Sequence, residues 1–532
     1  MDLRNRNIAT LENEVLDVLI LGGGINGAVS AAALSARGAR TGLIDARDFA
    51  GFTSQHSSNL VWGGIKYMEG YEFGLVSGLC RSRNQLLDSF PSTVREIRFL
   101  MTINRQFRFH PLVILASTWL YWLLGRGRTR IPRYLSASKI ETTEPLIDLG
   151  KSCAGIEYSD AFLHDNDARF VFNFVRNAMN NGCAAANYVE AVAASRDAAG
   201  LWLIEATDRE TGRHFTIRSR SLINATGAFV DQQNETAGIK TRHCHRLSKG
   251  IHLLVPRISE HHRVLAFFAD DERLFFAIPM ANRTCIGTTD TAVRDPETGV
   301  TDEDRDFVLS NINARLDLPN PLTRDDVIAE RCGVRPLAVR KSAGVATDVK
   351  KASRKHVIET DHNQQHISIF GGKLTDCLNV GAEICEQAER LGLELKHAGK
   401  WYGEPDGEIR SAFFRRARDL GLDDHIAADT REALAERLWR RYGANATSML
   451  DAIERDPTLA EPLIAQAGIR RCELDYLANN EMIVKLEDFL RRRSKIALLL
   501  PEDALRQSTG LEEACRRLFG DEAEQRIAEY FD

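Results

Sequence analysis

Three glycines near the start of the chain have the spacing of a dinucleotide-binding turn. Gly22, Gly24 and Gly27 follow the apolar run 15–21, and Asp45 ends a second apolar run about twenty residues later. In such a motif the glycines permit a tight turn, a close approach of the pyrophosphate and close packing of the helix on the strand. The phosphates lie at the helix N-terminus, and the acidic residue accepts hydrogen bonds from a ribose. The sequence therefore predicts an adenine dinucleotide held by Gly22, Gly24, Ile25, Asn26, Gly27 and Asp45.

Two later segments indicate which dinucleotide binds. Residues 221–228 read as a buried strand that enters a glycine turn at Thr226-Gly227, and residues 366–375 read as a strand that breaks at Gly371-Gly372. An NAD-binding domain needs no third contact segment hundreds of residues downstream. FAD does, because its isoalloxazine extends beyond the adenine half. We therefore expect FAD, with further contacts from Thr226, Gly227, Gly372, Lys373, Leu374 and Thr375.

The elements that must position these residues indicate an α/β fold, α+β overall, with a Rossmann-like FAD-binding domain. Residues 15–45 read as strand, helix and strand, with Gly38 ending the helix, and residues 201–206 and 215–218 read as hairpin strands. We assign 14–74, 151–245 and 341–395 to a discontinuous FAD-binding domain. Residues 75–150, mainly helical, and 246–340, rich in strands, form an interleaved β-sheet domain that faces substrate or membrane. Residues 400–532 form an all-helical C-terminal domain.

Composition excludes several classes of protein. A chain of 532 residues with 44% hydrophobic and 27% charged residues is an ordinary globular protein of two or three domains. Its net charge of −5 gives no reason to expect nucleic acid. Ten cysteines without a C-x-x-C pair favour reduced thiols, and His243-Cys244-His245 is read as a loop, so no metal is expected. Residues 1–7 lack a secretory apolar region, so we expect a cytoplasmic location.

Residues 111–124 form an uncharged, aromatic-rich apolar run that is too short to cross a bilayer. Arginines flank it at 105 and 108 and at 126, 128, 130 and 133. Such a segment suits a helix lying in a membrane interface. A buried helix whose arginines face water is the alternative.

The chain as a whole resembles the FAD-dependent glycerol-3-phosphate dehydrogenase family, within the D-amino-acid-oxidase-like superfamily. The likeness covers almost the whole chain. It is carried by Leu21 to Ala28, Thr53-Ser54, Ser57-Ser58, Gly63 to Glu69, Tyr71 to Phe73, Glu157 to Asp160, Asp165 to Arg169, Ile286 to Asp290, Gly333 to Leu337, Phe370 to Thr375, Arg441 to Gly443 and Glu487 to Arg493.

The resemblance implies oxidation of sn-glycerol 3-phosphate to dihydroxyacetone phosphate, with the C2 hydride passing to flavin N5. It implies that Arg335, Lys66 and Tyr67 bind the phosphate, that His252 accepts the hydroxyl proton, and that Lys373 stabilises charge on the flavin or the substrate oxygen. Taken alone, Arg335 and Lys373 could equally be solvated residues and His252 a structural one. The resemblance also adds cofactor contacts at Thr53, Ser54, Ser57, Asn59, Trp62, Gly63 and Val189.

Three positions depart from the family pattern. Asn59 stands where the family usually has Lys, Trp62 where it has His, and Lys66 where it has Arg. Either the pocket serves another polyol phosphate, or glycerol 3-phosphate is still oxidised with His252 or Lys373 as the base. In the family's membrane-bound members, electrons pass to quinone at the inner membrane, where 111–124 would be the membrane-binding segment. Oxygen as acceptor and a homodimeric state are left open.

Two other functions compete with this one. In an amino-acid or amine oxidase of the same superfamily, Arg335 would bind a carboxylate, although the C-terminal domain and residues 333–337 count against it. A catalytically silent FAD-binding protein is the third hypothesis, suggested by the missing pocket histidine.

Overall fold

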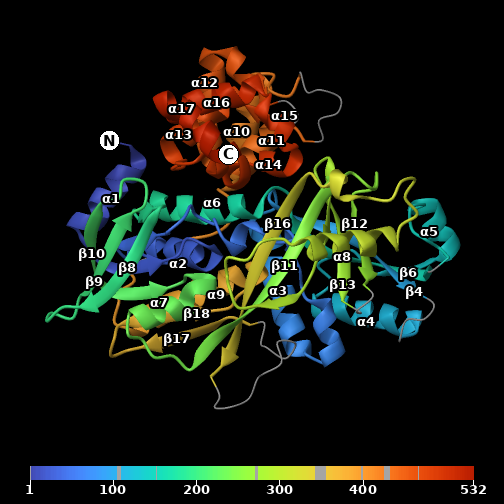
Figure 1. The fold of residues 1–532 in the computed structure, drawn as a ribbon, viewed down its shortest axis with the longest axis horizontal. Coiled ribbons are helices and arrows are strands. Elements are labelled where there is room, and N and C mark those ends of the chain that lie inside the picture. Colours follow the sequence, from blue (N-terminus) through green and yellow to red (C-terminus); the bar gives the residue numbers. More distant parts are fainter. Residues whose placement is uncertain are drawn as a thin grey trace. The chain divides into compact units, whose positions relative to one another are not determined.

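The structure is a computed structural model that describes residues 2–104, 109–150, 152–269, 273–341, 355–396, 399–424, 432–464 and 467–532. The chain divides into two compact units. The first unit comprises Met1–Gln55, Asp165–Leu247 and Arg335–Asp532, and the second comprises His56–His164 and Ser248–Val334. Figure 1 shows how the segments of each unit alternate along the chain.

The first unit is built on a mainly parallel sheet whose centre is formed by the predicted strands. Strands β18, β10, β1, β2 and β7 are parallel neighbours, while β17, β9 and β8 add antiparallel pairs. Their bounds are β1 Val15–Leu21, β2 Thr41–Ile44, β7 Ala184–Ala186, β8 Val189–Arg196, β9 Trp202–Asp208, β10 His214–Asn224, β17 Val357–Asp361 and β18 His366–Phe370. This arrangement confirms the α/β fold class.

One strand of this sheet is longer than expected. Residues 215–218 and 221–224 belong to a single strand, β10, because its first half pairs with β9 and its second half with β1. Side chains alternate between exposed and buried up to Arg220 and are buried on both faces beyond it. This change of pattern marks the step from a sheet edge to the sheet centre.

Helices cover this sheet, and one of them is made mostly of small residues. Helix α2 (Ile25–Ala36) has only one residue that is not buried, and it packs against α6 (Asp167–Asn180) and α9 (Cys377–Arg390). Alanine, glycine and serine dominate α2, so neighbouring backbones approach closely. The remaining helices of this part are α1 (Leu3–Asn13) and α7 (Val230–Thr236).

The second unit is built on a sheet of order β15-β11-β14-β13-β12-β4-β6-β3, with β16 beside β11 and β5 beside β6. Residues 56–74 and 151–164, expected in the FAD-binding domain, lie in this unit instead, because β3 pairs with β6 and β6 with β4. The stretch expected to be helical, 75–150, alternates helices with strands. The bounds are β3 Leu60–Val61, α3 Phe73–Ser89, β4 Val94–Asn104, α4 Pro111–Leu124, β5 Arg133–Ser136, α5 Ala137–Thr143, β6 Ser152–Leu163, β11 His243–Pro256, β12 Arg263–Phe268, β13 Leu274–Met280, β14 Arg283–Gly287, β15 Thr291–Val293, α8 Asp302–Asn313 and β16 Ala329–Arg340.

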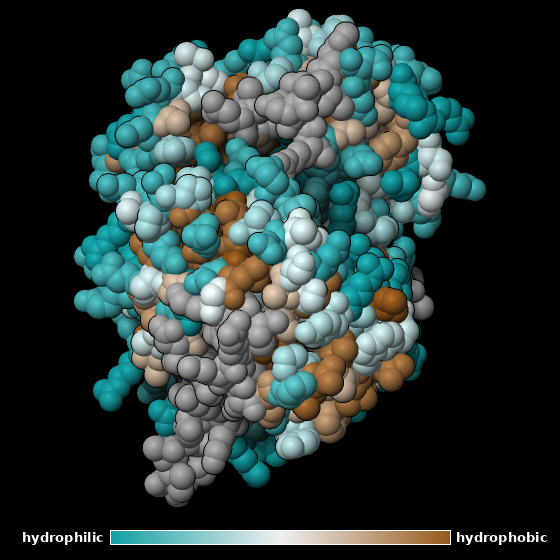
Figure 2. Space-filling model, turned by 90° about the vertical axis from the view of Figure 1, so that its right-hand side faces the viewer, coloured by the Kyte–Doolittle hydropathy of each residue, from teal (hydrophilic) through white to brown (hydrophobic). Residues whose placement is uncertain are grey.

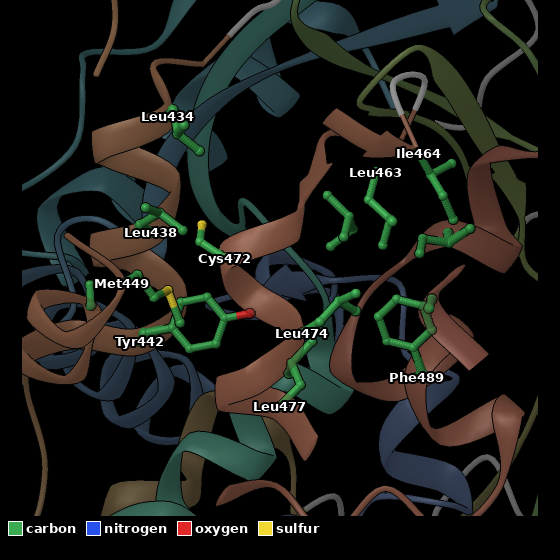
Figure 3. Packing of buried hydrophobic residues seen from close by; sticks show 14 of the residues in the cluster. Leu434, Leu438, Tyr442, Met449, Leu463, Ile464, Cys472, Leu474, Leu477 and Phe489 are labelled. Atoms are coloured by element: carbon green, nitrogen blue, oxygen red, sulfur yellow. The ribbon is translucent and has the colours of Figure 1, made fainter. Parts of the chain in front are cut away.

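The described residues of the C-terminal segment, 400–424, 432–464 and 467–532, are mainly helical with one short ribbon, and the segment falls within the first unit. Figure 3 shows its core, in which Leu438, Tyr442, Leu474 and Phe489 pack together. The bounds are α10 Gly407–Asp419, α11 Leu434–Tyr442, α12 Ala446–Arg455, β19 Pro462–Ile464, β20 Ile469–Arg470, α13 Arg471–Asn480, the π-helical turn η10 Asp488–Arg493, α14 Ile496–Leu499, α15 Glu502–Arg506, α16 Thr509–Phe519 and α17 Ala523–Phe531.

The apolar run 111–124 forms helix α4, with His110 as N-cap and a proline in the first turn. Only Thr118 and Tyr121 are buried, so the alternative of a buried helix is wrong. Among the described residues, no helix is both long and apolar enough to span a membrane.

Candidate functional site

The glycine turn after β1 is built as the motif predicts. Gly22 has φ +97°, and a Cβ there would lie 2.7 Å from the Ala225 carbonyl oxygen. A Cβ on Gly27 would lie 1.8 Å from the Gly22 carbonyl oxygen. The Ile25 N–H donates to Ser54 Oγ over 3.0 Å. Only glycine fits at these two positions, and the N-terminus of α2 is placed against the turn.

Asp45 is bound to the same turn. Its Oδ2 accepts a 2.6 Å hydrogen bond from the Gly23 N–H, and its Oδ1 accepts one of 2.8 Å from the Arg47 N–H. Burial raises the pKa of Asp45 to about 6, although these two hydrogen bonds lower it. Buried Val189 lies beside it and donates its N–H to the Asp45 carbonyl oxygen. The carboxylate is therefore held by the backbone, with further lone pairs available for a ribose.

The turn after β18 is held by two side chains from different parts of the first unit. Asn26 Nδ2 donates to the Gly371 carbonyl oxygen over 2.9 Å, and the Gly371 N–H donates to His245 Nε2 over 2.9 Å. Burial lowers the pKa of His245 to about 4, so the ring is neutral at neutral pH, and Nε2 is the nitrogen that accepts the hydrogen bond from Gly371. Gly371 and Gly372 have φ +67° and +107°, and Lys373 follows, half-buried. The sequence identified Asn26 but missed the role of His245, whose local pattern carries no such signal.

These residues fit a dinucleotide. A Cβ on Gly372 would lie 3.0 Å from Asn26 Oδ1, so glycine keeps this approach open. Asn26 Oδ1 is buried and has no hydrogen-bond partner among the described residues. An open glycine cradle with an unused buried acceptor is a site that a polar ligand completes.

The remaining residues expected in the first unit lie around these turns or on neighbouring elements. Thr53 and Ser54 belong to a short 3-10 turn, and Thr226 Oγ1 donates to Asn224 Oδ1 over 2.7 Å. Arg335, half-buried on β16, belongs to this unit as well. The residues placed here are Gly22, Gly24, Ile25, Asn26, Gly27, Asp45, Thr53, Ser54, Val189, Thr226, Gly227, Arg335, Gly372, Lys373, Leu374 and Thr375.

In the second unit, an aromatic face forms around Trp62. The Trp62 ring lies 6.1 Å from Tyr67 and 6.3 Å from Phe276, measured between centroids. His252, Gly287 and Phe276 are direct partners on β11, β14 and β13, so their Cα–Cβ directions share one sheet face. His252 is 2% exposed, and its ring packs against Gly287, where a Cβ would lie 2.9 Å from His252 Cδ2. The structure thus brings together Trp62, Tyr67, His252 and Phe276, which we name the aromatic face, while Lys66 is exposed.

Gly63, next to Trp62, is held by a buried ionic cluster. Its N–H lies 3.2 Å from both oxygens of Asp160, which also accept from Tyr121 Oη at 2.5 Å and Arg83 Nη1 at 3.1 Å. Burial raises the pKa of Asp160, whereas Arg83 and Tyr121 lower it. Asp160 was part of the resemblance, but its role became visible only when β6 was placed beside β3.

Asn59 is held by an arginine that the sequence did not single out. Arg331 Nη1 donates to Asn59 Oδ1 over 2.8 Å and to the Ser57 carbonyl oxygen over 2.5 Å, and Arg331 is fully buried. Asn59 has φ +59°, a conformation that asparagine tolerates. A buried guanidinium therefore contacts the side chain that stands where the resemblance leads one to expect a lysine.

The two histidines of the 243–245 loop are directed to different partners. His243 Nδ1 lies 2.6 Å from Glu359 Oε1, and His245 binds Gly371. In the part of the chain that the structure describes, no three His, Cys, Asp or Glu side chains gather as metal ligands.

The similarities to known proteins agree with this geometry. Residues 17–369 match the FAD dependent oxidoreductase family, and residues 381–525 match the C-terminal domain of alpha-glycerophosphate oxidase. The glycerol-3-phosphate dehydrogenase of Pseudomonas aeruginosa is 31% identical over 92% of this chain and 93% of its own length. The D-erythritol 1-phosphate dehydrogenase of Brucella abortus is 30% identical over 92% of this chain and 96% of its own length.

A solved structure shows the same fold. The glycerol-3-phosphate dehydrogenase of Bacillus halodurans, complexed with FAD, has a TM-score of 0.75 and 24% identity, covering 99% of this chain and 97% of that one. The chain therefore belongs to the FAD-dependent glycerol-3-phosphate dehydrogenase family and is an FAD-dependent oxidoreductase.

Proposed function

We propose that the protein oxidises a phosphorylated polyol, sn-glycerol 3-phosphate, to its ketone, dihydroxyacetone phosphate. The observation that carries this proposal is the similarity over more than nine-tenths of the chain to two enzymes named for phosphorylated polyols. The match of residues 381–525 to the alpha-glycerophosphate oxidase C-terminal domain counts against an amino-acid oxidase.

Three side chains are proposed to bind the phosphate. Arg335 supplies a guanidinium, which binds phosphate through two parallel hydrogen bonds. Lys66 adds a compact positive charge, and Tyr67 adds a hydroxyl next to it in the turn Ile65–Gly70. Together they neutralise a dianion, and Arg335 orients it.

His252 is proposed to accept the proton of the C2 hydroxyl on an imidazole nitrogen. It is buried on the aromatic face, where Trp62 and Phe276 exclude water and keep the imidazole in a low-dielectric setting. Bound at the glycine turn, FAD would supply the hydride-accepting chemistry for C2. Lys373 stabilises the negative charge that develops on the substrate oxygen or the cofactor.

Anaerobic mixing of the purified yellow protein with candidate substrates tests this function. Glycerol 3-phosphate should bleach the flavin band within seconds, whereas glycerol and amino acids should leave it unchanged. Faster bleaching by a four-carbon polyol phosphate would assign the altered pocket to that substrate. Bleaching by amino acids alone would establish an oxidase, and a panel without any bleaching would establish a silent FAD-binding protein.

Variants separate the proposed roles. Arg335→Ala should raise KM for the phosphorylated substrate through a loss of about 2–4 kcal/mol of binding, with kcat less affected. His252→Gln should lower kcat with little change in KM, because it removes the base and keeps the polar shape. An unchanged KM in the first variant, or an unchanged kcat in the second, would remove that residue from its role.

We also propose that α4 lies in a membrane interface. Leu112 and Leu123, at opposite ends of the helix, are each 61% exposed, and Val113, Trp119 and Leu120 are exposed as well. Figure 2 shows hydrophobic residues gathered on part of the face that it draws. Exposed apolar side chains on a helix too short to span suit the headgroup region.

Two of the flanking arginines offer less free positive charge for membrane binding than the sequence suggests. Arg128 binds Asp88 and Arg130 binds Glu96 through ion pairs, so these two charges are partly neutralised. Arg105 and Arg108 lie outside the described residues. We therefore expect binding to depend more on apolar burial than on lipid charge.

Vesicle flotation tests the interface proposal. The wild type should float with neutral and with anionic vesicles, and Leu112→Glu with Leu123→Glu should abolish flotation while FAD is retained. Ile409→Glu changes an exposed apolar side chain outside α4, 44% exposed on α10, and should float like the wild type. Failure of the wild type to float would end this proposal.

Quinone is the proposed electron acceptor, because a membrane-surface helix brings the protein to the phase in which quinones dissolve. The substrate-reduced protein should be reoxidised faster by a short-chain quinone than by oxygen at equal concentration. The opposite order would make the protein an oxidase.

A further inference from the structure

The C-terminal segment reaches the dinucleotide-binding part of the first unit through a buried carboxylate, Asp48. Arg492 Nε and Arg493 Nη1 each donate to Asp48 Oδ2 over 2.7 Å, and Arg493 Nη2 donates to Oδ1 over 2.8 Å. Asn187 Nδ2 completes the set with a 2.8 Å hydrogen bond to Oδ1. Asp48 is fully inaccessible, and both arginines are at most 2% exposed.

Asp48 lies in the loop that follows Asp45, and this loop is bound to the glycine turn at both ends. Asp45 accepts the Gly23 N–H, and the Ala50 N–H donates to the Gly23 carbonyl oxygen over 3.0 Å. Between them, the Phe49 ring lies so close that a Cβ on Gly23 would be 2.4 Å from it. A movement of Asp48 therefore moves the backbone that contacts Gly23.

The two arginines are fixed by further contacts of their own. The Arg493 guanidinium stacks on the Phe172 ring, 4.0 Å from its centroid, and donates to the Glu481 carbonyl oxygen. Arg492 Nη2 donates to Asp488 Oδ1 over 2.5 Å, and the Tyr188 hydroxyl donates to the same oxygen. Both arginines lie in the π-helical turn η10, a backbone form that recurs at functional sites.

The charged groups that act on Asp48 are Arg492, Arg493 and, beyond Arg492, Asp488. Burial alone would raise its pKa, but Arg493 and Arg492 hold it below the ordinary value. Asp488 lies beyond Arg492, and burial raises its pKa. Arg492 also forms ion pairs with Asp488 and Glu487, so carboxylates balance the charge of the two arginines, and the loop is held electrostatically as well as by hydrogen bonds.

We propose that Arg492 and Arg493 are positioning residues for FAD, through which the C-terminal segment holds the Asp45–Ala50 loop against the glycine turn. This role goes beyond substrate oxidation and gives the C-terminal segment a function in cofactor retention. It rests on the proposed placement of FAD at Gly22–Gly27 and Asp45. Because coupling between two sites is reciprocal, FAD in turn stabilises the docking of the arginines.

Titration of FAD into apoprotein tests the proposal. Asp48→Asn and Arg493→Met should each weaken FAD binding at least tenfold, and Arg493→Lys should recover part of the loss. Arg437→Lys is the matched control, because it alters a buried ion pair with Glu473 inside the C-terminal segment. This control should lower the thermal unfolding temperature and leave the FAD dissociation constant within twofold. The proposal would be overturned if Arg437→Lys weakened FAD binding equally, or if Asp48→Asn and Arg493→Met left the FAD dissociation constant unchanged.

Two further measurements keep the outcomes distinct. Asp45→Ala must weaken FAD binding if FAD lies at the glycine turn. Weaker binding in this variant, with unchanged binding in the Asp48 and Arg493 variants, would refute the positioning role alone. In the wild type, hydrogen exchange of residues 481–494 should slow when FAD is added to the apoprotein. Unchanged exchange there would refute the coupling even if a variant failed to fold.

Discussion

The glycine turn of the first unit and the aromatic face of the second unit are built by different means. The turn consists of backbone groups from one continuous stretch, Gly22–Gly27, closed by Asp45. The aromatic face takes Trp62 and Tyr67 from one segment, and His252 and Phe276 from strands about two hundred residues later. A site made of backbone is visible in local spacing, whereas a site made of side chains depends on which strands become neighbours.

The two regions also differ in how they tolerate change. The turn is limited by sterics at positions where only glycine fits. The segment that leads to the aromatic face is held by buried cations, Arg331 at Asn59 and Arg83 at Asp160. We therefore expect substitutions in the glycine turn to destabilise the protein through steric overlap with the backbone. Substitutions of the buried arginines should destabilise it by leaving polar groups without a hydrogen-bond partner.

Gly27→Ala should have the largest effect. Its Cβ would lie 1.8 Å from a backbone carbonyl oxygen, so α2 must move away from β1 at a cost of more than about 4 kcal/mol. Urea unfolding and FAD titration measure the change. Gly78→Ala on α3, where nothing lies within 4 Å, should be neutral or stabilising by up to about 1 kcal/mol. Equal effects in the two variants would contradict the steric account.

Arg331→Met should lower the free energy of unfolding by about 3 kcal/mol. The substitution removes the guanidinium that donates to buried Asn59 Oδ1 and to the half-buried Ser57 carbonyl oxygen. Chemical denaturation of the holoprotein measures the loss. Arg324→Met removes an arginine whose ion pairs with Asp302 and Asp306 are exposed, and it should change stability little. A small effect of Arg331→Met would show that the second region does not depend on its buried cations.

His356 tests whether side-chain charges also matter near the turn after β18. Its Nδ1 lies 2.8 Å from Asp376 and its Nε2 3.0 Å from Glu383. Burial lowers its pKa, but the hydrogen bonds to Asp376 and Glu383 raise the pKa to about 9. Because the folded pKa exceeds the unfolded value of 6.5, the stabilisation is complete below pH 6.5 and is lost as pH rises through 9.

His356→Gln should accordingly cost about 2 kcal/mol at pH 6, less than the full linkage value because Glu383 is partly exposed. The difference from the wild type should vanish near pH 10. Unfolding curves at both pH values decide the matter, and a difference that does not depend on pH would contradict the charge assignment.

Asp45→Asn should have the smallest effect. At pH 8 the ionised carboxylate is a better acceptor than an amide, so FAD affinity should fall about tenfold. Because burial raises the pKa of Asp45 to about 6, the wild type carries a neutral acid at pH 5, and the two proteins should bind FAD alike there. Dissociation constants at the two pH values measure this, and a tenfold gap that persists at pH 5 would be the contrary result.

The family resemblance and the FAD prediction were confirmed, and so was the fold class. Strands β1, β2, β9 and β18 lie where local hydrophobic pattern predicts them, because a buried strand next to a glycine break has few other interpretations. The segment 75–150 was misjudged, since β4 is a strand only by virtue of pairing with β6 and β12. The site roles remain proposals.

The sequence by itself determined the cofactor turn, because glycine permits a positive φ at 22 and a close backbone approach at 22 and 27 that other residues do not, and the spacing of these glycines is local. Only the tertiary structure decided which distant side chains bind and fix the segments of the candidate site. His245 at Gly371, Arg331 at Asn59, Asp160 at Gly63, and Arg493 at Asp48 are pairs separated by about one hundred to four hundred residues. The physical reason is burial: a charged group removed from water must find a partner, and which partner is within reach is set by the packing of whole sheets and helices rather than by local spacing.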